Sequence, residues 1–338
     1  KTDNWDEVGE SENFKKALAD IPWYSWQEQM KFKSIIKKEK VDLMHFPHWN
    51  VPLLYNDPFV VTIHDLIMYK FPRPEATTLG PIKFWLKDMV HRLLVNHAVK
   101  KSKHIIVTSE FTKHDVHETL GVDLEKMTVT YQAPFETRNK KQETNNNQIT
   151  NSNKQILLTK FEINKPYVLY VGAAYPHKNL GRLIQAWKLF EEEYKGDYQL
   201  VLVGKENYFY QRLMSNVKCQ LSNVSYLGFI PDNELVELYK NASLYVFPSM
   251  YEGFGIPPLE AQQYDVPVVS SNASCLPEVL GESALYFDPE NVEQIADIIY
   301  TGITNEDIRF ELQNNARENL KRFSWEKLAI KTLDIYQK

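Results

Sequence analysis

The chain has 338 residues, of which 43% are hydrophobic and 25% charged, a composition typical of a globular protein with room for two domains. Its net charge of −5 argues against general nucleic-acid binding. No apolar run approaches the ~20 residues of a membrane span. Cys219 and Cys275 give neither a disulfide framework nor zinc-type spacing with the histidines. We therefore expect a cytoplasmic protein of a reducing compartment, without a bound metal.

The first half of the chain alternates predicted helices and strands. Near-helical spacing of Trp26, Met30 and Ile36 predicts an amphipathic helix from Ser25. Further helices are predicted at 81–103 and 110–120, and strands at 41–46, 59–63, 104–108 and 127–131. Alternation of this kind is typical of a doubly wound parallel α/β sheet.

A break in composition separates this half from a second alternation. The run Asn145–Asn153 has almost no apolar content, which predicts a linker over 137–165. Beyond it, strands are predicted at 167–171, 199–203, 224–227, 244–247 and 266–269, and helices at 180–194, 208–221, 232–240, 292–301 and 325–337. The predicted domains are 1–136 and 166–322, followed by a C-terminal helix within 323–338.

Charge is spread unevenly between the halves. Residues 1–165 carry 24 Lys+Arg against 21 Asp+Glu, and residues 166–338 carry 15 against 23. The basic excess gathers at 83–103, in Lys83, Lys87, Arg92, Lys100, Lys101 and Lys103. Two interpretations stay open: a solvated helix, or a docking face for anionic lipid or a phosphate-bearing acceptor.

The stretch Pro248–Glu260 combines a buried strand end, a glycine turn and a helix start. Gly253 and Gly255 let the backbone approach a ligand or take positive φ, and Pro257 fits the first helical turn. This arrangement binds anions through backbone N–H groups. Glu252 and Glu260 bracket the turn with seven residues between them; a carboxylate there suits sugar hydroxyls better than phosphates.

At this Glu-x7-Glu with Gly-Phe-Gly the sequence resembles the retaining glycosyltransferases of family 4. The resemblance covers residues 25–338, with the motifs in the family's order. It implies the α/β GT-B architecture: two Rossmann-like, doubly wound parallel-sheet domains facing a cleft, with the C-terminal helix crossing back to the first domain.

The resemblance implies a donor site in the second half. Lys178 would hold the diphosphate, Glu252 the donor sugar and Glu260 the ribose. Further donor contacts would come from Gly172, Gly204, Lys205, Ile230, Gly253, Phe254, Gly255 and Ile256. The family often has arginine where this chain has Ala173; a mannosyltransferase subset also lacks it and carries Lys-Asn-Leu, as here. Taken alone, Lys178 also fits an exposed lysine at a helix start.

Fewer residues in the first half match the family. His64 ends a predicted strand, where the resemblance places a His-Asp pair facing the transferred sugar, although a lone buried histidine is more often structural. Asp65, His45 and His48 are weaker acceptor-side candidates, and either histidine fits a structural role. Ser109 is interpreted mainly as a helix cap and, as the weaker alternative, as an acceptor-side residue that lines the cleft.

The implied reaction is metal-independent glycosyl transfer with retention, from a nucleotide sugar to a saccharide or lipid-linked acceptor in polysaccharide assembly. GDP-mannose is weakly favoured, no cofactor is expected, and Glu252, His64 and Lys178 are the catalytic candidates. The chain contains no Asp-x-Asp pair, so Lys178 and helix-terminal amides would neutralise the leaving diphosphate. The alternative is a non-catalytic nucleotide-sugar-binding subunit of an assembly complex.

One family feature has no counterpart in residues 1–24. There the family opens with a strand and a glycine-rich turn, whereas this stretch holds a single glycine, Gly9. We therefore expect a first sheet lacking at least one strand, with exposed edges that favour association. The 338-residue chain would then bind nucleotide but transfer sugar poorly until upstream residues are added.

Overall fold

The computed structural model describes residues 13–22, 24–74, 80–135, 158–194, 196–217 and 223–337, which form two compact units. Within these residues the first unit runs to Thr108, resumes over Thr112–Thr130 and takes in the C-terminal stretch from Ile330. The second consists of Ser109–Phe111 and of the residues between Tyr131 and Ala329. The Asn-rich run lies outside the described residues.

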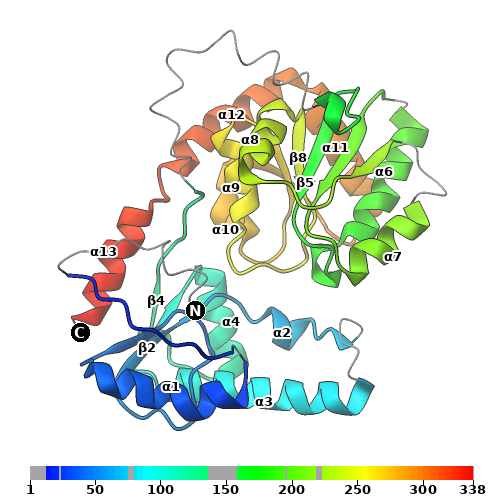
Figure 1. Cartoon of the computed structure of the whole chain (residues 1–338). Coiled ribbons are helices and arrows are strands. Elements are labelled where there is room, and N and C mark those ends of the chain that lie inside the picture. Colours follow the sequence, from blue (N-terminus) through cyan, green and yellow to red (C-terminus); the bar gives the residue numbers. More distant parts are fainter. Residues whose placement is uncertain are drawn as a thin grey trace. The chain divides into compact units, whose positions relative to one another are not determined.

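The first unit is built on a parallel four-stranded sheet in the order β1-β2-β3-β4 (Figure 1). The strands are Met44–Phe46, Phe59–Ile63, His104–Val107 and Met127–Val129. Register pairs Met44 with Phe59 and Ile105 with Met127. Every residue of β2 is buried, as expected of a parallel strand covered on both faces. The associated helices are α1 (Trp26–Glu39), α2 (Ile67–Lys70), α3 (Gly80–Lys101) and α4 (Glu110–Leu120).

The start of α1 shows why the sequence predicts a helix there. Ser25 Oγ accepts a hydrogen bond from the Glu28 N–H at 3.2 Å, and the Glu28 carboxylate accepts from the Tyr24 N–H at 2.7 Å. This reciprocal cap satisfies backbone donors that the helix itself leaves unpaired. Lys40 closes the helix in the left-handed region, with φ of 53°.

The C-terminal helix α13 (Trp325–Tyr336) contributes its last residues to the first unit. Ile335 is buried against Val60 of β2 and Ile106 of β3. The Tyr336 hydroxyl contacts His45 Nδ1 in β1. Tyr336 and its partner His45 are thus almost three hundred residues apart in sequence. A local sequence pattern cannot reveal such a contact.

The second unit holds a parallel six-stranded sheet in the order β10-β9-β8-β5-β6-β7. Its strands are β5 (Tyr167–Val171), β6 (Gln199–Val203), β7 (Val224–Tyr226), β8 (Leu244–Phe247), β9 (Val268–Ser271) and β10 (Ala284–Phe287). From β5 the chain adds β6 and β7 on one side, then returns to place β8 on the other. Strand order therefore reverses between β5 and β8.

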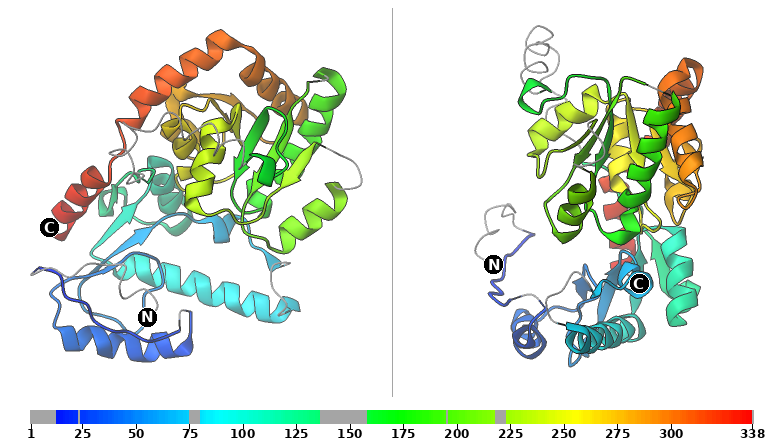
Figure 2. Two further views of the ribbon diagram at one scale, coloured as in Figure 1. Left: turned by 45° about the horizontal axis from the view of Figure 1, so that its top comes forward. Right: turned by 90° about the vertical axis from the view of Figure 1, so that its right-hand side faces the viewer.

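Helices cover both faces of this sheet, as Figures 1 and 2 show. They are α6 (Leu180–Tyr194), α7 (Tyr208–Val217), α8 (Asp232–Asn241), α9 (Ile256–Gln263), α10 (Leu276–Leu280), α11 (Val292–Thr304) and α12 (Glu306–Leu320). Helix α6 packs against α11, and α9 packs against α8 and α12. Trp187, Phe190 and Tyr245 are among the largest fully buried side chains of the core between these layers. The two parallel sheets with their helices confirm the predicted α/β class.

Several features differ from the sequence-based prediction. The strand predicted at 266–269 lies at Val268–Ser271, because Pro267 has no N–H to donate to the ladder. Strand β10 was not predicted, although its sequence Ala-Leu-Tyr-Phe is an apolar run of the same length as β8. Helix α12 was also not predicted, since its surface is polar, yet Asn305 Oδ1 accepts from the Ile308 N–H and supplies the missed helix-start signal.

Candidate functional site

The strongest candidate site lies in the second unit, where strand order reverses. Ligands of open α/β sheets bind outside the carboxyl ends of the strands at such a point. Strand β5 leads into Gly172 and the short 3₁₀ helix η6 (Pro176–Lys178), and β8 leads into Pro248–Gly255. The tertiary structure thereby brings together two motifs that are about seventy residues apart in sequence.

Lys178 and Glu252 form an ion pair at this position. Lys178 Nζ lies 2.5 Å from Glu252 Oε1, and the side chains are only 18% and 9% exposed. The Glu252 N–H donates to Ser274 Oγ at 3.0 Å, and the Lys178 ammonium lies 5.6 Å from the centre of the Phe247 ring. Lys178 is therefore a largely buried cation rather than an exposed lysine at a helix start.

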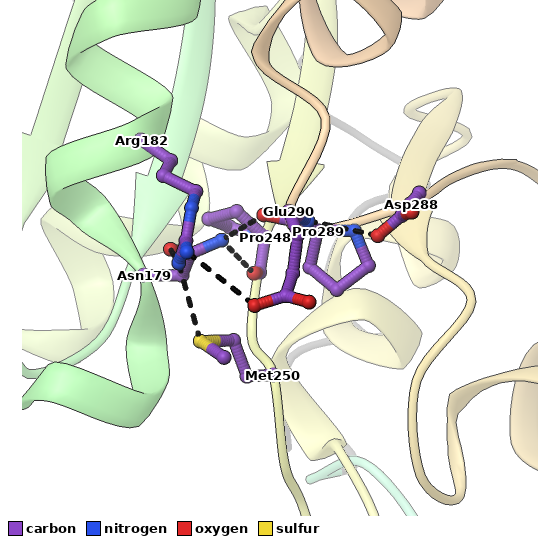
Figure 3. A network of polar contacts seen from close by, with 7 residues as sticks. All are labelled: Asn179, Arg182, Pro248, Met250, Asp288, Pro289 and Glu290. Carbon is purple, nitrogen blue, oxygen red and sulfur yellow. Dashed lines mark hydrogen bonds and ion pairs between the residues drawn. The ribbon is translucent and has the colours of Figure 1, made fainter.

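The next residue, Asn179, ties the Lys178 loop to the rest of the site (Figure 3). It is buried and left-handed, with φ of 61°, a conformation that asparagine tolerates better than most residues. Its side-chain amide donates to the Pro248 carbonyl at 3.2 Å and the Pro289 carbonyl at 2.7 Å. The loops after β5, β8 and β10 are thus fastened through one side chain.

Arg182, in the first turn of α6, supports this arrangement (Figure 3). Its guanidinium donates to Asn179 Oδ1 at 3.1 Å and forms an ion pair with Glu290 at 3.4 Å. Sequence reasoning quoted the Lys-Asn-Leu motif but assigned no role to Asn179 or Arg182. An asparagine directly before a helix was the available signal.

Glycines end three neighbouring strands of the sheet. The Gly172 N–H donates to the Val203 carbonyl, and the Gly204 N–H donates to the Gly228 carbonyl, both at 2.9 Å. A Cβ at position 204 would lie 2.0 Å from the Gly172 carbonyl oxygen. Gly204 is therefore required by backbone packing, whether or not a ligand approaches it. Lys205 follows as an exposed side chain.

The turn before α9 has the predicted strand–turn–helix form. Gly255 is the N-cap residue with φ of 89°, and a Cβ there would come 2.8 Å from Leu276. Phe254 is buried and packs against Tyr131 and Phe323, so it can offer a ligand only its backbone N–H. Ile256 is half-buried at the start of the helix.

Glu260 lies in the second turn of α9, beyond the N-terminal N–H groups. Its Oε2 accepts a hydrogen bond from the Tyr239 hydroxyl at 3.0 Å. Burial raises the pKa of Glu260 above its ordinary value of 4.5, and the Tyr239 hydrogen bond partly opposes this. Ile230, one of the predicted donor contacts, follows β7 and is buried.

Residues 109–111 also belong to this unit. Ser109 is fully buried and donates its hydroxyl to the Gly253 carbonyl at 2.7 Å. The N–H groups of Glu110 and Phe111 donate to the Glu278 carboxylate at 2.7 and 2.9 Å. A carboxylate at these first N–H groups of α4 is electrostatically favourable, and nothing local in the sequence predicts it.

In the first unit, His64 follows the carboxyl end of β2. Its Nε2–H donates to the Pro47 carbonyl at 2.9 Å, and its own carbonyl accepts from Thr108 Oγ1 at 2.8 Å. Asp65 Oδ1 accepts from the Ile67 N–H at 2.8 Å, which caps the short helix α2. The ring orientation of His64 is therefore set by the backbone of a neighbouring loop.

His45 and His48 have different surroundings. Both ring nitrogens of His45 are engaged, Nδ1 by Tyr336 and Nε2 by Thr62, which favours the structural interpretation of this residue. His48 lies 6.3 Å from His64 between ring centres and 4.7 Å from Trp49. Burial, and secondarily the His64 charge, lowers the pKa of His48 to about 4.

His91 of α3 joins this aromatic group, and sequence reasoning gave it no role. Its ring lies 4.4 Å from Trp49 and 5.6 Å from Tyr69. Burial lowers its pKa to about 4, although Asp88 acts in the opposite direction. His48 and His91 are thus neutral at neutral pH and behave as packing residues.

No group of three or more His, Cys, Asp or Glu side chains that could hold a metal ion occurs among the residues that the structure describes. The candidate site in the second unit offers two carboxylates, a lysine ammonium and backbone N–H groups. Metal independence of the reaction stays a prediction.

Comparison with known sequences identifies the family. The sequence profile described as Glycosyl transferases group 1 matches residues 153–321, half of the chain, and that described as Glycosyltransferase Family 4 matches residues 7–133. The chain is 29% identical to O-antigen chain mannosyltransferase B of Escherichia coli over 305 residues, covering 87% of this chain and 74% of the relative. It is 29% identical to O-antigen chain mannosyltransferase RfbU of Salmonella typhimurium over 308 residues, covering 88% and 77%.

Solved structures agree on the fold. Anabaena HepE in complex with UDP and glucose superposes with a TM-score of 0.70 at 19% identity, covering 94% of this chain and 84% of that one. A sucrose-phosphate synthase from Thermosynechococcus elongatus gives 0.70 at 19% identity, covering 94% and 79%. The chain belongs to the group 1 glycosyltransferases, with the GT-B architecture that its Glu-x7-Glu motif predicts.

Proposed function

We propose that this glycosyltransferase transfers a mannosyl residue with retention, without a metal, from GDP-mannose to a saccharide or lipid-linked saccharide. Its place would be the assembly of a cell-surface polysaccharide. Two relatives that match most of the chain are O-antigen mannosyltransferases. The Lys-Asn-Leu motif and Ala173 agree with that mannosyltransferase subset.

The ion pair of Lys178 and Glu252 is the observation that carries the proposal. A largely buried lysine lies at the carboxyl ends of β5 and β8, where our proposal puts the donor diphosphate, and it is already neutralised by one carboxylate. When the donor binds, the ammonium is shared with the diphosphate, and Glu252 turns its second oxygen to the sugar hydroxyls. Charge that develops on the leaving diphosphate then meets a fixed cation, which lowers the barrier.

The remaining donor contacts follow from the same unit. Glu260, held by Tyr239, accepts from the ribose hydroxyls. The N–H groups at the start of α9 face the phosphates, because the helix dipole favours negative charge there. The first unit supplies His64, which holds the transferred sugar. With no second carboxylate assigned as a nucleophile, the acceptor attacks from the side the diphosphate leaves, and the departing oxygen takes its proton.

Purified protein incubated with GDP-mannose, GDP-glucose, UDP-glucose and an oligosaccharide acceptor tests this function. Of the three donors, we expect only GDP-mannose to support turnover, at the low rate that the sequence predicts for this chain, with an α-linked product by NMR and an unchanged rate in EDTA. A β-linked product would refute retention, and loss of turnover in EDTA restored by Mn²⁺ would refute metal independence. Donor binding without transfer or donor hydrolysis would favour the non-catalytic subunit instead.

A further inference from the structure

Helix α3 exposes a continuous apolar stripe. Six of its large hydrophobic side chains are between 39% and 75% exposed: Ile82, Trp85, Leu86, Met89, Val90 and Leu93. They follow one another at intervals of one or three residues, so all six fall on one face of the helix. At a rise of 1.5 Å per residue the stripe is ~16 Å long.

The opposite face of α3 is buried, as is usual for a helix that packs against a sheet in an α/β unit. Val95, Ala98 and Val99 are fully buried there, and the helix packs against β2. The helix is therefore apolar on two faces, of which only one is covered by the described residues. Single exposed apolar side chains are ordinary on protein surfaces, but a contiguous row of six indicates an interaction surface.

Basic side chains border the stripe. Lys83 and Lys87 lie one turn apart along one edge and are both exposed. The acidic residue within this stretch, Asp88, is held in an ion pair with Arg92 at 2.7 Å. The surface around the stripe is therefore cationic, and Lys100 and Lys101 extend the positive charge to the end of the helix.

We propose that α3 docks this chain on an anionic lipid bilayer, with the stripe immersed in the interface and Lys83 and Lys87 at the lipid headgroups. An amphipathic helix of this kind lies in the plane of the membrane. Among the described residues, no helix is long and apolar enough to cross one. Trp85 has the amphipathic ring that favours the membrane interface.

Charge decides between a bilayer and a second copy of the chain. A symmetric contact between two α3 helices would bring Lys83 and Lys87 of both copies together, and like charges in contact oppose association. An anionic bilayer attracts the same lysines, and its interior is apolar. It therefore complements both the charged edge and the apolar stripe of α3. This inference concerns where the enzyme works and does not depend on the identity of the donor.

Sedimentation with vesicles tests the proposal on the full 338-residue chain. Vesicles of phosphatidylcholine alone are compared with vesicles that also contain phosphatidylglycerol. We expect binding only to the second kind, weakened by salt because the lysine term is screened. The double variant Lys83→Gln/Lys87→Gln should bind ~30-fold more weakly, at about fivefold per lysine. Trp85→Ser/Leu86→Ser should lose at least tenfold.

Matched controls remove the same chemistry elsewhere. Lys188→Gln/Lys321→Gln takes two exposed lysines from the second unit, and Phe310→Ser removes an exposed aromatic side chain from α12. Both controls should bind like the wild type, and all variants should keep its thermal unfolding temperature because the altered side chains are exposed. Equal binding to both vesicle types, or unchanged binding of the α3 variants, would overturn the proposal. A dimer that Trp85→Ser/Leu86→Ser dissolves in the absence of lipid would show that a second copy covers the stripe.

Discussion

At the scale of single residues, the proposed chemistry rests on a buried cation whose partner is itself a candidate sugar-binding group. Lys178 and Glu252 lie 2.5 Å apart with most of their surface removed from water. Breaking such a pair by removing one partner leaves a buried charge without compensation, which costs about 3–5 kcal/mol when burial is complete. Because Lys178 keeps 18% of its side-chain exposure, we expect the lower end of this range.

Replacing Lys178 with methionine should therefore act on both stability and turnover. We expect kcat to fall about 100-fold or more, the size of effect seen when one charge-stabilising donor is lost. Urea unfolding should show a loss of stability that Lys178→Met/Glu252→Gln partly restores, since the second change removes the orphaned charge. A variant with unchanged kcat would show that Lys178 does not contact the leaving group.

The two glutamates of the motif should separate kinetically. Glu260→Ala removes a ground-state contact to the ribose and should mainly raise the KM for the donor. Glu252→Ala should mainly lower kcat, because sugar positioning matters most as charge develops at the anomeric carbon. Tyr239→Phe is the control for Glu260: it removes the orienting hydrogen bond and should give a smaller KM effect. Loss of donor affinity alone in both alanine variants would contradict this division of roles.

At the scale of elements, the site depends on loops fastened at the carboxyl ends of β5, β8 and β10. Asn179 performs this fastening with one side chain in a left-handed backbone conformation. Because Asn179 directly follows Lys178, its hydrogen bonds also hold the backbone from which the ammonium would reach the proposed diphosphate. We therefore assign Asn179 a positioning role.

Substitution of Asn179 should separate backbone strain from lost hydrogen bonds. Asn179→Gly keeps the left-handed conformation but loses all three side-chain hydrogen bonds, and we expect kcat to fall about tenfold with donor KM less affected. Asn179→Ala should be less stable than Asn179→Gly by about 1 kcal/mol, because alanine is strained at positive φ. Steady-state kinetics and thermal unfolding measure the two effects. Equal stability of the two variants would contradict the strain argument.

The aromatic group of the first unit should make that unit sensitive to acid. His48 and His91 have pKa values lowered to about 4, against 6.5 in an unfolded chain. Between these pH values the two histidines are protonated in the unfolded chain but neutral in the folded unit. Their contribution to the free energy of unfolding is therefore fully present above pH 6.5 and is lost as the pH falls towards 4. His91→Gln should flatten this dependence in urea unfolding followed by tryptophan fluorescence. His114→Gln, at an exposed position, is the matched control, and an equal effect of both would refute the assignment.

At the scale of the whole molecule, the proposed donor site and the proposed lipid-docking helix belong to different units. The donor candidates lie in the second unit, whereas the stripe of α3 lies in the first. Helix α13 is shared: it begins in the second unit and ends against β2 and β3 of the first. The two activities are therefore separable by mutation although one helix joins the units.

Hydrogen exchange with GDP, UDP and guanosine tests where nucleotide binds. GDP should protect amides after β5 and β8 and at the start of α9, and should raise the unfolding temperature in proportion to its concentration over Kd. Guanosine lacks the diphosphate and should protect only the loop after β7 that contains Ile230. Stronger protection by UDP than by GDP would overturn the assignment of the base. Protection confined to the first unit would overturn the site itself.

The sequence by itself determined the α/β class, most element positions and the family, because these depend on local signals. Apolar runs marked β5, β6 and β8, the near-helical spacing of Trp26, Met30 and Ile36 marked α1, and the Glu-x7-Glu turn marked the start of α9. Boundaries failed where the local signal was weak, as at Pro267 and in the polar helix α12. The roles of Lys178, Glu252 and Glu260 came from resemblance and stay predictions.

Only the tertiary structure decided which residues meet. The ion pair of Lys178 with Glu252 exists because strand order places β5 beside β8, and hydrogen bonding between strands is not encoded in the spacing along the chain. The contacts of Asn179 with Pro289, of Glu278 with the start of α4, and of Tyr336 with His45 have the same origin. The exposed stripe of α3 was hidden for a related reason: apolar residues on both faces of a helix give no periodicity, and only packing shows which face is left uncovered.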